Sequence, residues 1–588
     1  MISNTSSLDC MMKQAEAQTS SDRTDLFSRH EGSHVLPNSP LFTKLIRHAH
    51  KGRNAIRDPA LGVTKTYADV LSDALSLRTK IEQTLDQGTL ARLKNGREVF
   101  MGVLAPGGYE FTVAILAALA LGAAVVPMSV HNPVNEAAFF VTASQQVLLL
   151  TSSTAAPLAH NVAAFIAKQQ QDHSNLPVIE VLPNLPRTPT LIASQILISS
   201  DRHLNDNAAG IVIFTSGTTG RPKGAVLRRA YTHETALAIA EGYNIQPTDI
   251  LLHVLPVHHA TGLGTSFFPF LVSGASIEFR TGSFETAMIW QPFADREITF
   301  FSGVPTLYMR LMWHWQKQIA SLPIREKARY EAGANHLRII ACGSSALQQP
   351  TQLRQGQPIL VRYGSSEVPA CIRYSAGIDY SLIPKSSVGS AVPGVETKLS
   401  PGGELLIKSP FMFSKYLHDP VATATAHDEE GFFRSGDICH NEGDWIFVMG
   451  RASLDIIKSG GYKIGAVEIE QCLLGLPYVW EAMVVGVDDE EFRQRVDCAV
   501  TLDSDLVTAA SGLDVETLRA SLRGKLPGYK LPPVLRVVPG ELPKGATGKV
   551  QKKILGPKFF PVGRWRTEPE VQVWGAKKKG MPEVRARL

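Results

Sequence analysis

The sequence predicts an α/β fold: a large N-terminal domain of parallel-type sheets and helices with a small β-rich subdomain, then a smaller α+β C-terminal domain. Between residues 98 and 300, short apolar runs alternate with helical patterns, which is typical of parallel strands joined by helices. From about residue 388 to 449, short strand-like runs are separated by Gly, Pro and Asp turns, which indicates the β-rich part. The chain has 588 residues, too many for one hydrophobic core, so we expect several domains.

Buried strands are predicted at the short apolar runs, and helices at the patterns between them. The predicted strands are Val99–Leu104, Ala123–Val126, Val147–Leu150, Val178–Val181, Ile211–Phe214, Ile250–Leu255, Ile277–Phe279, Phe300–Ser302, Leu337–Ala341 and Ile359–Val361. The predicted helices include residues 108–121, His233–Glu241 and Ala287–Arg296. The most apolar segment, residues 111–126, is divided by Gly122 and followed by Pro127. We therefore expect a buried helix that leads into a parallel strand, and no transmembrane span.

The composition favours a small anionic ligand over nucleic acid. The net charge of +5 is spread over the whole chain, and the dense basic block Lys577-Lys578-Lys579 has no interleaved aromatic residues. Hydrophobic residues make up 44% and charged residues 19%, as in an ordinary globular protein. The six cysteines show no CxxC spacing, so we predict reduced intracellular thiols and neither a disulfide framework nor a zinc site.

Both ends of the chain bear on its location in the cell. Residues 1–50 have no apolar signal region, and their acidic residues argue against a mitochondrial transit peptide. The last three residues, Ala586-Arg587-Leu588, resemble the peroxisomal address Ser-Lys-Leu at a free carboxylate. We predict a peroxisomal protein whose tripeptide binds the peroxisomal import receptor, and a cytoplasmic protein otherwise.

A glycine- and hydroxyl-rich loop follows the predicted strand Ile211–Phe214. It reads Thr215-Ser216-Gly217-Thr218-Thr219-Gly220-Arg221-Pro222-Lys223-Gly224. Glycines let backbone N–H groups crowd around one point, while the hydroxyls add donors and the two cations add charge. Such a loop is suited to wrap a polyphosphate. It is not a Walker A loop, because no Gly-Lys-Ser/Thr closes it.

The loop resembles the phosphate loop of the adenylate-forming superfamily, which contains acyl-CoA synthetases, adenylation domains and luciferases. Four further segments resemble this family's motifs, in the family's order, so that the resemblance covers roughly residues 40–558. They are Tyr363-Gly364-Ser365-Ser366-Glu367, in which Ser replaces the usual Thr, Phe433-Arg434-Ser435-Gly436-Asp437, the hinge region Gly450-Arg451 to Lys463, and Pro543-Lys544-Gly545-Ala546-Thr547-Gly548-Lys549.

The resemblance implies a domain organisation. We expect an N-terminal AMP-binding domain at residues 41–450, with the β-rich subdomain at 388–449, after a loosely ordered extension at 1–40. A hinge at 451–454 would precede a mobile C-terminal domain at 455–558, and a basic tail would follow at 559–588.

The implied chemistry is the activation of a carboxylate by ATP, which needs fixed donors and positive charge around the phosphates. Lys549 would bridge the substrate carboxylate and the α-phosphate, Glu367 would ligate Mg²⁺, and Thr215 is counted with them as catalytic. Tyr363 would stack on adenine and Asp437 would accept from the ribose hydroxyls, with support from Arg451. The full set predicted to bind ATP is Thr215, Ser216, Gly217, Thr218, Thr219, Gly220, Lys223, Gly343, Ser344, Tyr363, Gly364, Ser366, Asp437 and Arg451.

The resemblance also implies a thiol channel and an acyl pocket. Lys458, Gly460 and Gly461 would line the channel for coenzyme A, since no carrier domain is attached, and Ser453 occupies the usual pivot of the hinge. The acyl pocket is predicted at His259, Arg310 and Gly343.

The segment that contains Arg310 resembles the malonyl-CoA synthetase branch, where an arginine at this position grips the distal carboxylate. A solvated helix residue is an equally weighted interpretation of Arg310. Thr261 stands where that branch usually has a second His, and the loop 348–360 looks shortened.

We therefore predict an ATP-dependent acyl-CoA synthetase that uses ATP, Mg²⁺ and coenzyme A and acts on a short dicarboxylate such as malonate. A medium-chain or aromatic acid is the alternative substrate. A catalytically weak, nucleotide-binding homologue is the alternative of another class, kept open by Ser366 and the short loop.

Overall fold

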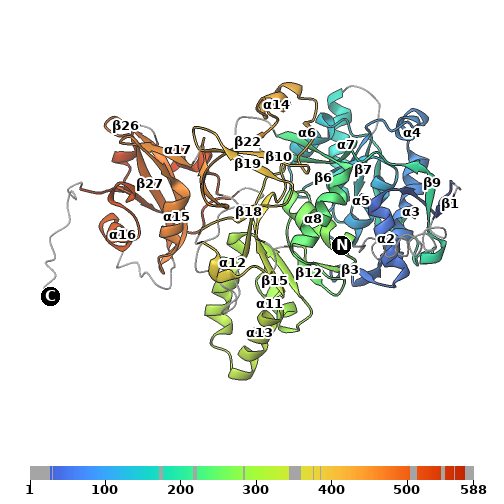
Figure 1. The fold of residues 1–588 in the computed structure, drawn as a ribbon, viewed down its shortest axis with the longest axis horizontal. Coiled ribbons are helices and arrows are strands. Elements are labelled where there is room, and N and C mark those ends of the chain that lie inside the picture. The colour runs from blue at the N-terminus through green and yellow to red at the C-terminus, as the bar shows by residue number, and fades with distance from the viewer. Residues whose placement is uncertain are drawn as a thin grey trace, which may run out of the picture. The chain divides into compact units, whose positions relative to one another are not determined.

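The computed structural model describes residues 27–28, 31–170, 176–215, 222–282, 285–343, 359–374, 377–384, 386–453, 455–502, 513–544, 550–561 and 563–575. The chain divides into two compact units. The first comprises residues 1–344, 353–378 and 409–426, and the second comprises residues 345–352, 379–408 and 427–588. Each unit is described by itself (Figure 1).

A seven-stranded sheet of the first unit carries the predicted phosphate loop at one strand end. Its order is β21 (Lys415–Tyr416), β11 (Lys223–Arg228), β10 (Ala209–Thr215), β6 (Ala124–Met128), β5 (Phe100–Leu104), β7 (Leu148–Thr151) and β8 (Val178–Glu180). The strands from β10 to β8 are parallel, whereas β11 runs antiparallel to both β10 and β21. The hairpin β10–β11 therefore turns back at the loop.

A second, mostly parallel sheet lies in the same unit. Its order there is β17 (Ile372–Arg373), β16 (Leu360–Tyr363), β15 (Ile339–Cys342), β14 (Phe300–Gly303), β12 (Ile250–His253), β13 (Ser276–Phe279), β3 (Asn54–Asp58) and β4 (Val63–Thr66). A small parallel sheet joins β1 (Phe27–Ser28), β9 (Leu197–His203) and β2 (Val35–Asn38). Because β14, β15 and β16 are parallel, their carboxyl ends meet at one edge.

Helices cover these sheets. They are α2 (Pro40–His50), α3 (Tyr67–Thr84), α4 (Gln87–Lys94), α5 (Tyr109–Ala120), α6 (Val134–Ala143), α7 (Ala156–Gln170), α8 (Glu234–Gly242), α9 (Ala260–Gly262), α10 (Phe268–Ser273), α11 (Ala287–Ala294), α12 (Pro305–His314), α13 (Ile324–His336) and α14 (Pro420–Thr425). α3 begins at a capping box in which Thr66 and Asp69 bond each other's backbone amides. It packs beside α5, all of whose residues are buried (Figure 1).

The predicted α/β fold class is confirmed, and each predicted strand has a counterpart within a few residues. The apolar segment forms the buried helix α5 and strand β6, as predicted, with a left-handed Gly122 between them (φ +83°). Pro127, which was expected to end the strand, lies inside it. Among the described helices, none is long and apolar enough to cross a membrane.

The second unit contains three small sheets. One has the order β19 (Glu396–Leu399), β20 (Glu404–Lys408), β22 (Phe433–Glu442) and β23 (Trp445–Arg451), after the short β18 (Ser390–Ala391). The hairpin of β24 (Ile456–Ser459) and β25 (Tyr462–Gly465) forms the second. The third has the order β26 (Val479–Asp489), β27 (Arg493–Leu502), β28 (Val534–Val537) and β29 (Val571–Val573), accompanied by α15 (Ala466–Leu474), α16 (Val515–Leu522) and α17 (Lys552–Phe559).

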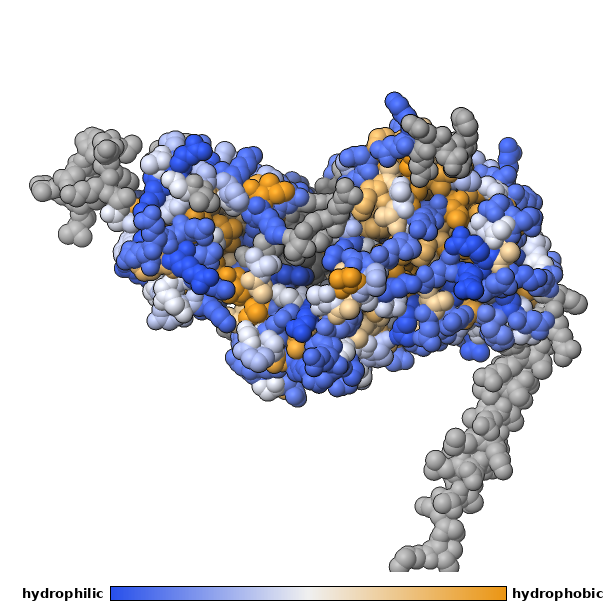
Figure 2. All heavy atoms as spheres, turned by 90° about the horizontal axis from the view of Figure 1, so that it is seen from above, coloured by the Kyte–Doolittle hydropathy of each residue, from blue (hydrophilic) through white to orange (hydrophobic). Residues whose placement is uncertain are grey.

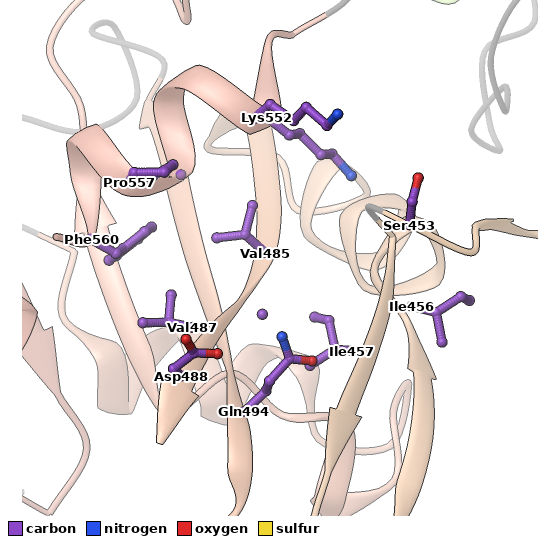
Figure 3. Close-up of a pocket in the computed structure, with 13 residues that line it drawn as sticks. Ser453, Ile456, Ile457, Val485, Val487, Asp488, Gln494, Lys552, Pro557 and Phe560 are labelled. Carbon is purple, nitrogen blue, oxygen red and sulfur yellow. The ribbon is translucent and has the colours of Figure 1, made fainter. Parts of the chain in front are cut away.

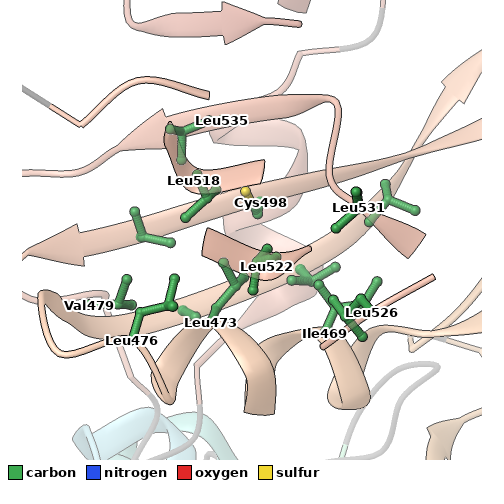
Figure 4. Packing of buried hydrophobic residues seen from close by; sticks show 14 of the residues in the cluster. Ile469, Leu473, Leu476, Val479, Cys498, Leu518, Leu522, Leu526, Leu531 and Leu535 are labelled. Atoms are coloured by element: carbon green, nitrogen blue, oxygen red, sulfur yellow. The ribbon is translucent and has the colours of Figure 1, made fainter. Parts of the chain in front are cut away.

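An apolar cluster joins α15 and α16 to one face of the third sheet (Figure 4). Leu473, Leu518, Leu522 and Leu535 are each fully buried in it. Burial of a leucine side chain stabilises a fold by about 1.5–3 kcal/mol, so this cluster gives the sheet and its helices a common core.

Part of the predicted basic tail is built into the fold. Residues 571–573 form β29, which pairs antiparallel with β28, and Trp565 is buried with 4% exposure. The sequence-based prediction of a tail at 559–588 did not include this strand.

On the surface seen in Figure 2, hydrophilic residues cover most of the visible face and apolar residues lie in smaller areas between them.

Asp497 is a fully buried carboxyl group in β27, between Val485 of β26 and Val534 of β28. Within the part of the chain that the structure describes, neither carboxyl oxygen has a hydrogen-bond partner. Burial raises the pKa of Asp497 well above its ordinary value. The group is therefore held in its neutral form.

This raised pKa predicts a loss of stability with rising pH. The folded protein keeps a proton on Asp497 that the unfolded chain releases above about pH 4. The stabilisation is present below that pH and is lost as the pH rises toward the folded-state pKa. Urea unfolding at pH 5 and pH 8 should show a smaller fall in stability for Asp497→Asn than for the wild type. Asp488→Asn, on an exposed carboxylate of the neighbouring strand, should behave like the wild type, and an equal fall in all three proteins would contradict the assignment.

Candidate functional site

The predicted phosphate loop lies at the turn of the β10–β11 hairpin. Thr215 and Lys223 are paired across the hairpin, and the Thr215 hydroxyl donates to the Lys223 carbonyl at 3.4 Å. The two residues therefore mark the base of the loop. Residues 216–221, with the predicted ligands Ser216, Gly217, Thr218, Thr219 and Gly220, lie outside the described residues.

Lys223 and Glu367 are brought together by Tyr416 of β21. The Tyr416 hydroxyl donates to Glu367 Oε1 at 2.9 Å, and the Lys223 ammonium lies 5.2 Å from the centre of the Tyr416 ring. The Phe413 amide donates to the Glu367 carbonyl at 2.8 Å. A predicted phosphate-binding cation and the predicted metal ligand thus share one aromatic side chain. Sequence reasoning missed Tyr416, which lies far from both residues along the chain.

The Tyr363-Gly364-Ser365-Ser366-Glu367 motif begins at the end of β16 and forms a tight turn. The Ser365 amide donates to the Val368 carbonyl at 3.0 Å, and the Val368 amide donates to the Ser365 hydroxyl at 3.2 Å. A Cβ atom on Gly364 would collide with the Ala370 amide nitrogen and lie 2.7 Å from the Val368 carbonyl. Glycine is therefore required there, and the half-buried Tyr363, Ser366 and Glu367 are presented around it.

Gly343 directly follows β15 and lies beside a buried arginine that the sequence did not single out. Arg362 of β16 is 5% exposed, and its Nη2 donates to the Ser302 hydroxyl at 2.9 Å. Among the described residues, its Nε and Nη1 groups have no hydrogen-bond partner. A Cβ atom on Gly343 would lie 3.0 Å from Arg362 Nε, so glycine leaves room beside the guanidinium. Ser344, the other predicted residue of this turn, lies outside the described residues.

The unpartnered N–H groups of Arg362 are costly in a protein interior, where a buried cation needs an anion or several acceptors. No carboxylate of the described residues forms an ion pair with Arg362. The geometry therefore offers two donors and one positive charge to an anion. The signal available in the sequence was only an arginine before Tyr-Gly, which by itself resembles a surface charge.

The predicted acyl-pocket segment surrounds His258 and His259. Their rings lie 4.4 Å apart, and His259 immediately precedes α9. Burial, followed by the neighbouring His259 and His131, lowers the pKa of His258 to about 3, so this imidazole is neutral. A π-helical turn, Leu263–Phe267, follows. Such turns are often found at functional sites.

Arg310 lies in the second turn of α12 and is half-buried. The helix begins with Pro305 and is fastened to the sheet by Tyr308, whose buried hydroxyl donates to the Ala341 carbonyl of β15 at 2.6 Å. This hydrogen bond joins α12, the helix of Arg310, to the sheet edge at which Gly343 and Arg362 lie.

Asp437 and Arg451 are adjacent in the second unit. They are opposite each other on β22 and β23, and Arg451 Nε lies 3.0 Å from Asp437 Oδ1. Arg451 Nη1 also donates to the Ser435 carbonyl at 3.4 Å. The structure thus brings together the two residues that were predicted to hold a ribose.

Lys458, Gly460 and Gly461 lie at the tip of the β24–β25 hairpin. Gly460 and Gly461 form its two-residue turn with φ of +54° and +85°, a conformation that favours glycine. Lys458 is exposed and pairs with Lys463 across the hairpin. Lys549 lies outside the described residues, between Lys544 and Val550, which pair antiparallel.

Among the described residues, no three His, Cys, Asp or Glu side chains are grouped as a metal site would require. None of the described cysteines is joined in a disulfide, and burial raises the pKa of Cys342 and of Cys371 to about 12. Neither thiol is therefore a nucleophile at neutral pH.

Comparison with known proteins identifies the family. Residues 49–417 match the model of the AMP-binding enzymes, and residues 468–549 match that of the AMP-binding enzyme C-terminal domain. The chain belongs to the AMP-binding enzyme family. An acyl-CoA ligase, oryP of Aspergillus oryzae, is 30% identical over 91% of this chain and 94% of its own. The mitochondrial malonate–CoA ligase ACSF3 of Bos taurus is 29% identical over 84% of this chain and 87% of its own.

The fold is also that of a solved enzyme. The ATP-bound crystal structure of MatB from Rhodopseudomonas palustris aligns with a TM-score of 0.71 at 24% identity, over 88% of this chain and 98% of MatB. The predicted superfamily is confirmed. The prediction of an ATP-dependent acyl-CoA synthetase, an AMP-forming acid–thiol ligase, is confirmed at the level of the family.

The turn after β16 supplies a direct test of the motif geometry. Gly364→Ala should force the 364–370 turn apart at a cost of about 1–3 kcal/mol, because the new methyl group meets backbone on two sides. We expect weaker ATP binding in calorimetry. Gly402→Ala, where a Cβ atom would meet only the Ser400 hydroxyl at 3.8 Å, is the matched control. Unchanged ATP affinity in Gly364→Ala would show that this turn does not shape the nucleotide site.

Proposed function

We propose that the acid activated by this ligase is a short dicarboxylate such as malonate. The reaction joins one carboxylate to AMP with release of pyrophosphate and then passes the acyl group to the thiol of coenzyme A. The second carboxylate takes no part in bond making, so the enzyme must hold a bare anion within the acyl pocket. A positively charged side chain in a fixed position is needed to bind this second carboxylate.

Arg362 is the observation that carries this proposal. It is a buried guanidinium with two N–H groups that have no hydrogen-bond partner among the described residues, and it packs directly against Gly343. A planar guanidinium binds a carboxylate through two parallel hydrogen bonds. The distal carboxylate of a dicarboxylate would supply the missing acceptors and the missing charge. The names of the malonate–CoA ligases among the relatives point to the same acid.

Arg310 is proposed as a second cation for the same carboxylate. Its helix is bonded through Tyr308 to β15, the strand beside that of Arg362. Thr261 argues for the alternative, a longer or less polar acid, since it removes an imidazole that malonyl-CoA synthetase-like sequences have at this position.

Glu367 and Lys223 are proposed to serve the phosphates. Glu367 fits the chemistry of a Mg²⁺ ligand, because it offers hard carboxylate oxygens and is oriented by the Tyr416 hydroxyl. A bound Mg²⁺ ion would neutralise charge on the phosphate oxygens. Lys223 adds a point charge at the base of the loop, and its contact with the Tyr416 ring holds it there.

The remaining roles follow the predicted motifs. Lys549 is proposed as the cation that meets the substrate carboxylate and the α-phosphate, and Asp437 with Arg451 as the ribose site. Lys458 and the Gly460-Gly461 turn are proposed to border the path of coenzyme A.

We also propose a peroxisomal location, based on the C-terminal Ala586-Arg587-Leu588. An N-terminally tagged fluorescent fusion should gather in peroxisomes, and the same fusion without the last three residues should be diffuse. Identical distributions of the two fusions would reject the address.

The substrate proposal is tested by removing the charge of Arg362. Arg362→Met leaves the distal carboxylate without its partner, so kcat/KM for malonate should fall by roughly two to four decades. Use of butyrate, which has no distal charge, should fall much less. Because an unpaired buried cation is replaced by an apolar side chain, the variant should unfold at the same or a higher temperature.

Arg373→Met is the matched control. Arg373 is equally buried at 5% exposure and lies opposite Arg362 on β17, but its guanidinium donates to the carbonyls of Ala370 and Ala238. Its loss should lower stability without changing the preference between malonate and butyrate. If Arg362→Met keeps full malonate activity, or loses both acids equally, the proposal is wrong.

A further inference from the structure

Lys552, the first residue of α17, is held between two carboxylates in the second unit. Its ammonium lies 2.5 Å from Asp455 Oδ1 and 2.7 Å from Glu470 Oε1, and the three side chains are only 13–15% exposed. Burial alone would lower the pKa of Lys552, but Glu470 and Asp455 outweigh it and the pKa lies above its ordinary value. The ammonium is therefore charged in neutral solution.

A buried group of this kind contributes little net stability, because desolvation of the charges offsets their attraction. Its value is geometric: the donors and acceptors fix the chain segments that carry them. The two carboxylates that Lys552 contacts, those of Asp455 and Glu470, belong to different segments of the second unit. Glu470 Oε1 also accepts from the Val484 amide of β26 at 2.7 Å, so α17 is tied to the central hairpin of the third sheet.

Asp455 ties Lys552 to the predicted hinge. Its Oδ2 atom accepts from the Arg451 amide at 3.0 Å, while its own amide donates to the Arg451 carbonyl at 2.8 Å. Its carbonyl accepts from the Ala466 amide at 2.7 Å. Residue 450 must be glycine for this approach, since a Cβ atom there would lie 2.5 Å from the Asp455 Cβ. Asp455 thus closes a hydrogen-bonded loop back to Arg451.

The same loop leads to the predicted ribose site. The Arg451 side chain, whose backbone amide is fixed by Asp455, reaches Asp437 at 3.0 Å. A continuous series of contacts therefore runs from Asp437 through Arg451 and Asp455 to Lys552.

The hinge region and α17 line a common cavity. Its volume is about 250 Å³, and its lining includes Ser453 and Ile456 of the hinge region and Val485, Lys552 and Phe560 (Figure 3). The Asp455–Lys552 pair joins the two segments directly by a charged contact.

We propose that Asp455 and Lys552 are a positioning pair for acyl-adenylate formation. Their contact fixes the start of α17 to the hinge loop. Because Lys552 lies three residues after Lys549, the pair thereby positions the chain that leads on from Lys549. This inference rests on the proposed role of Lys549. It does not depend on the identity of the acid.

The test separates the two half-reactions. Adenylation is followed as pyrophosphate release without coenzyme A, using the acid that the wild type adenylates fastest, and thiol transfer as the consumption of synthetic acyl-adenylate on addition of coenzyme A. Lys552→Met should lower kcat of adenylation by roughly tenfold to hundredfold, as expected for a misplaced catalytic group, with little change in KM for ATP. Thiol transfer should be affected much less, because it does not use the proposed contact of Lys549 with the carboxylate and the α-phosphate.

Lys552→Arg should restore most of the adenylation rate, because it keeps the charge between the carboxylates. Lys553→Met is the matched control: Lys553 is the next residue of α17, it is exposed, and among the described residues it forms no ion pair. It should leave both half-reactions unchanged. An adenylation rate equal to that of the wild type in Lys552→Met, or an equal fall in both half-reactions, would overturn the proposal.

Asp455→Asn keeps the test usable if Lys552→Met does not fold, because asparagine retains an acceptor for the Arg451 amide but removes the charge opposite Lys552. It should show the same selective loss of adenylation. Where both singles fold, the double variant should be no worse than the poorer single one, since the two residues act as one unit. Additive losses would contradict the pairing. A wild type that ignores malonate would reject the proposed acid and leave this comparison valid.

Discussion

The proposed acyl site depends on one buried positive charge whose donors have no partner among the described residues. An anion that completed the hydrogen bonds of Arg362 would offset the hydration that its guanidinium loses inside the protein. The parallel sheet creates this situation. It brings the ends of β14, β15 and β16 to one edge, so that Ser302, Gly343 and Arg362 are neighbours although they are far apart in sequence.

The same edge carries a residue of the predicted nucleotide site on the opposite face of the strand. Successive residues of β16 point to opposite sides, so Tyr363 is presented away from Arg362 and leads directly into the tight turn that carries Glu367. Tyr416 then contacts both Glu367 and Lys223, which are far apart in the sequence. In the second unit, Asp437, Arg451, Asp455 and Lys552 form a corresponding series of charged contacts. In both units, one side chain orients the next.

Much of this could be predicted from the sequence, and the exceptions have physical reasons. Buried strands were predictable because their apolar runs are continuous, and Gly364 because its motif requires a close backbone approach. β11 was missed because Lys223 and Arg228 at its ends hide a short apolar centre. Arg362, Tyr416 and the Asp455–Lys552 pair were missed because their meaning depends on partners remote in sequence. The identity of the substrate acid could not be predicted for the same reason, because the sequence does not show whether a charged residue in a motif has a partner.

The most direct measurement is the acid preference of the unmodified enzyme. Pyrophosphate release should be followed with ATP, Mg²⁺ and coenzyme A for malonate, methylmalonate, butyrate, octanoate and benzoate under identical conditions. The account predicts the highest kcat/KM for malonate or its methyl derivative, since only these acids have a second carboxylate that could pair with Arg362. A clear preference for octanoate or benzoate would contradict it, and would mean that Arg362 is not the partner of a substrate carboxylate.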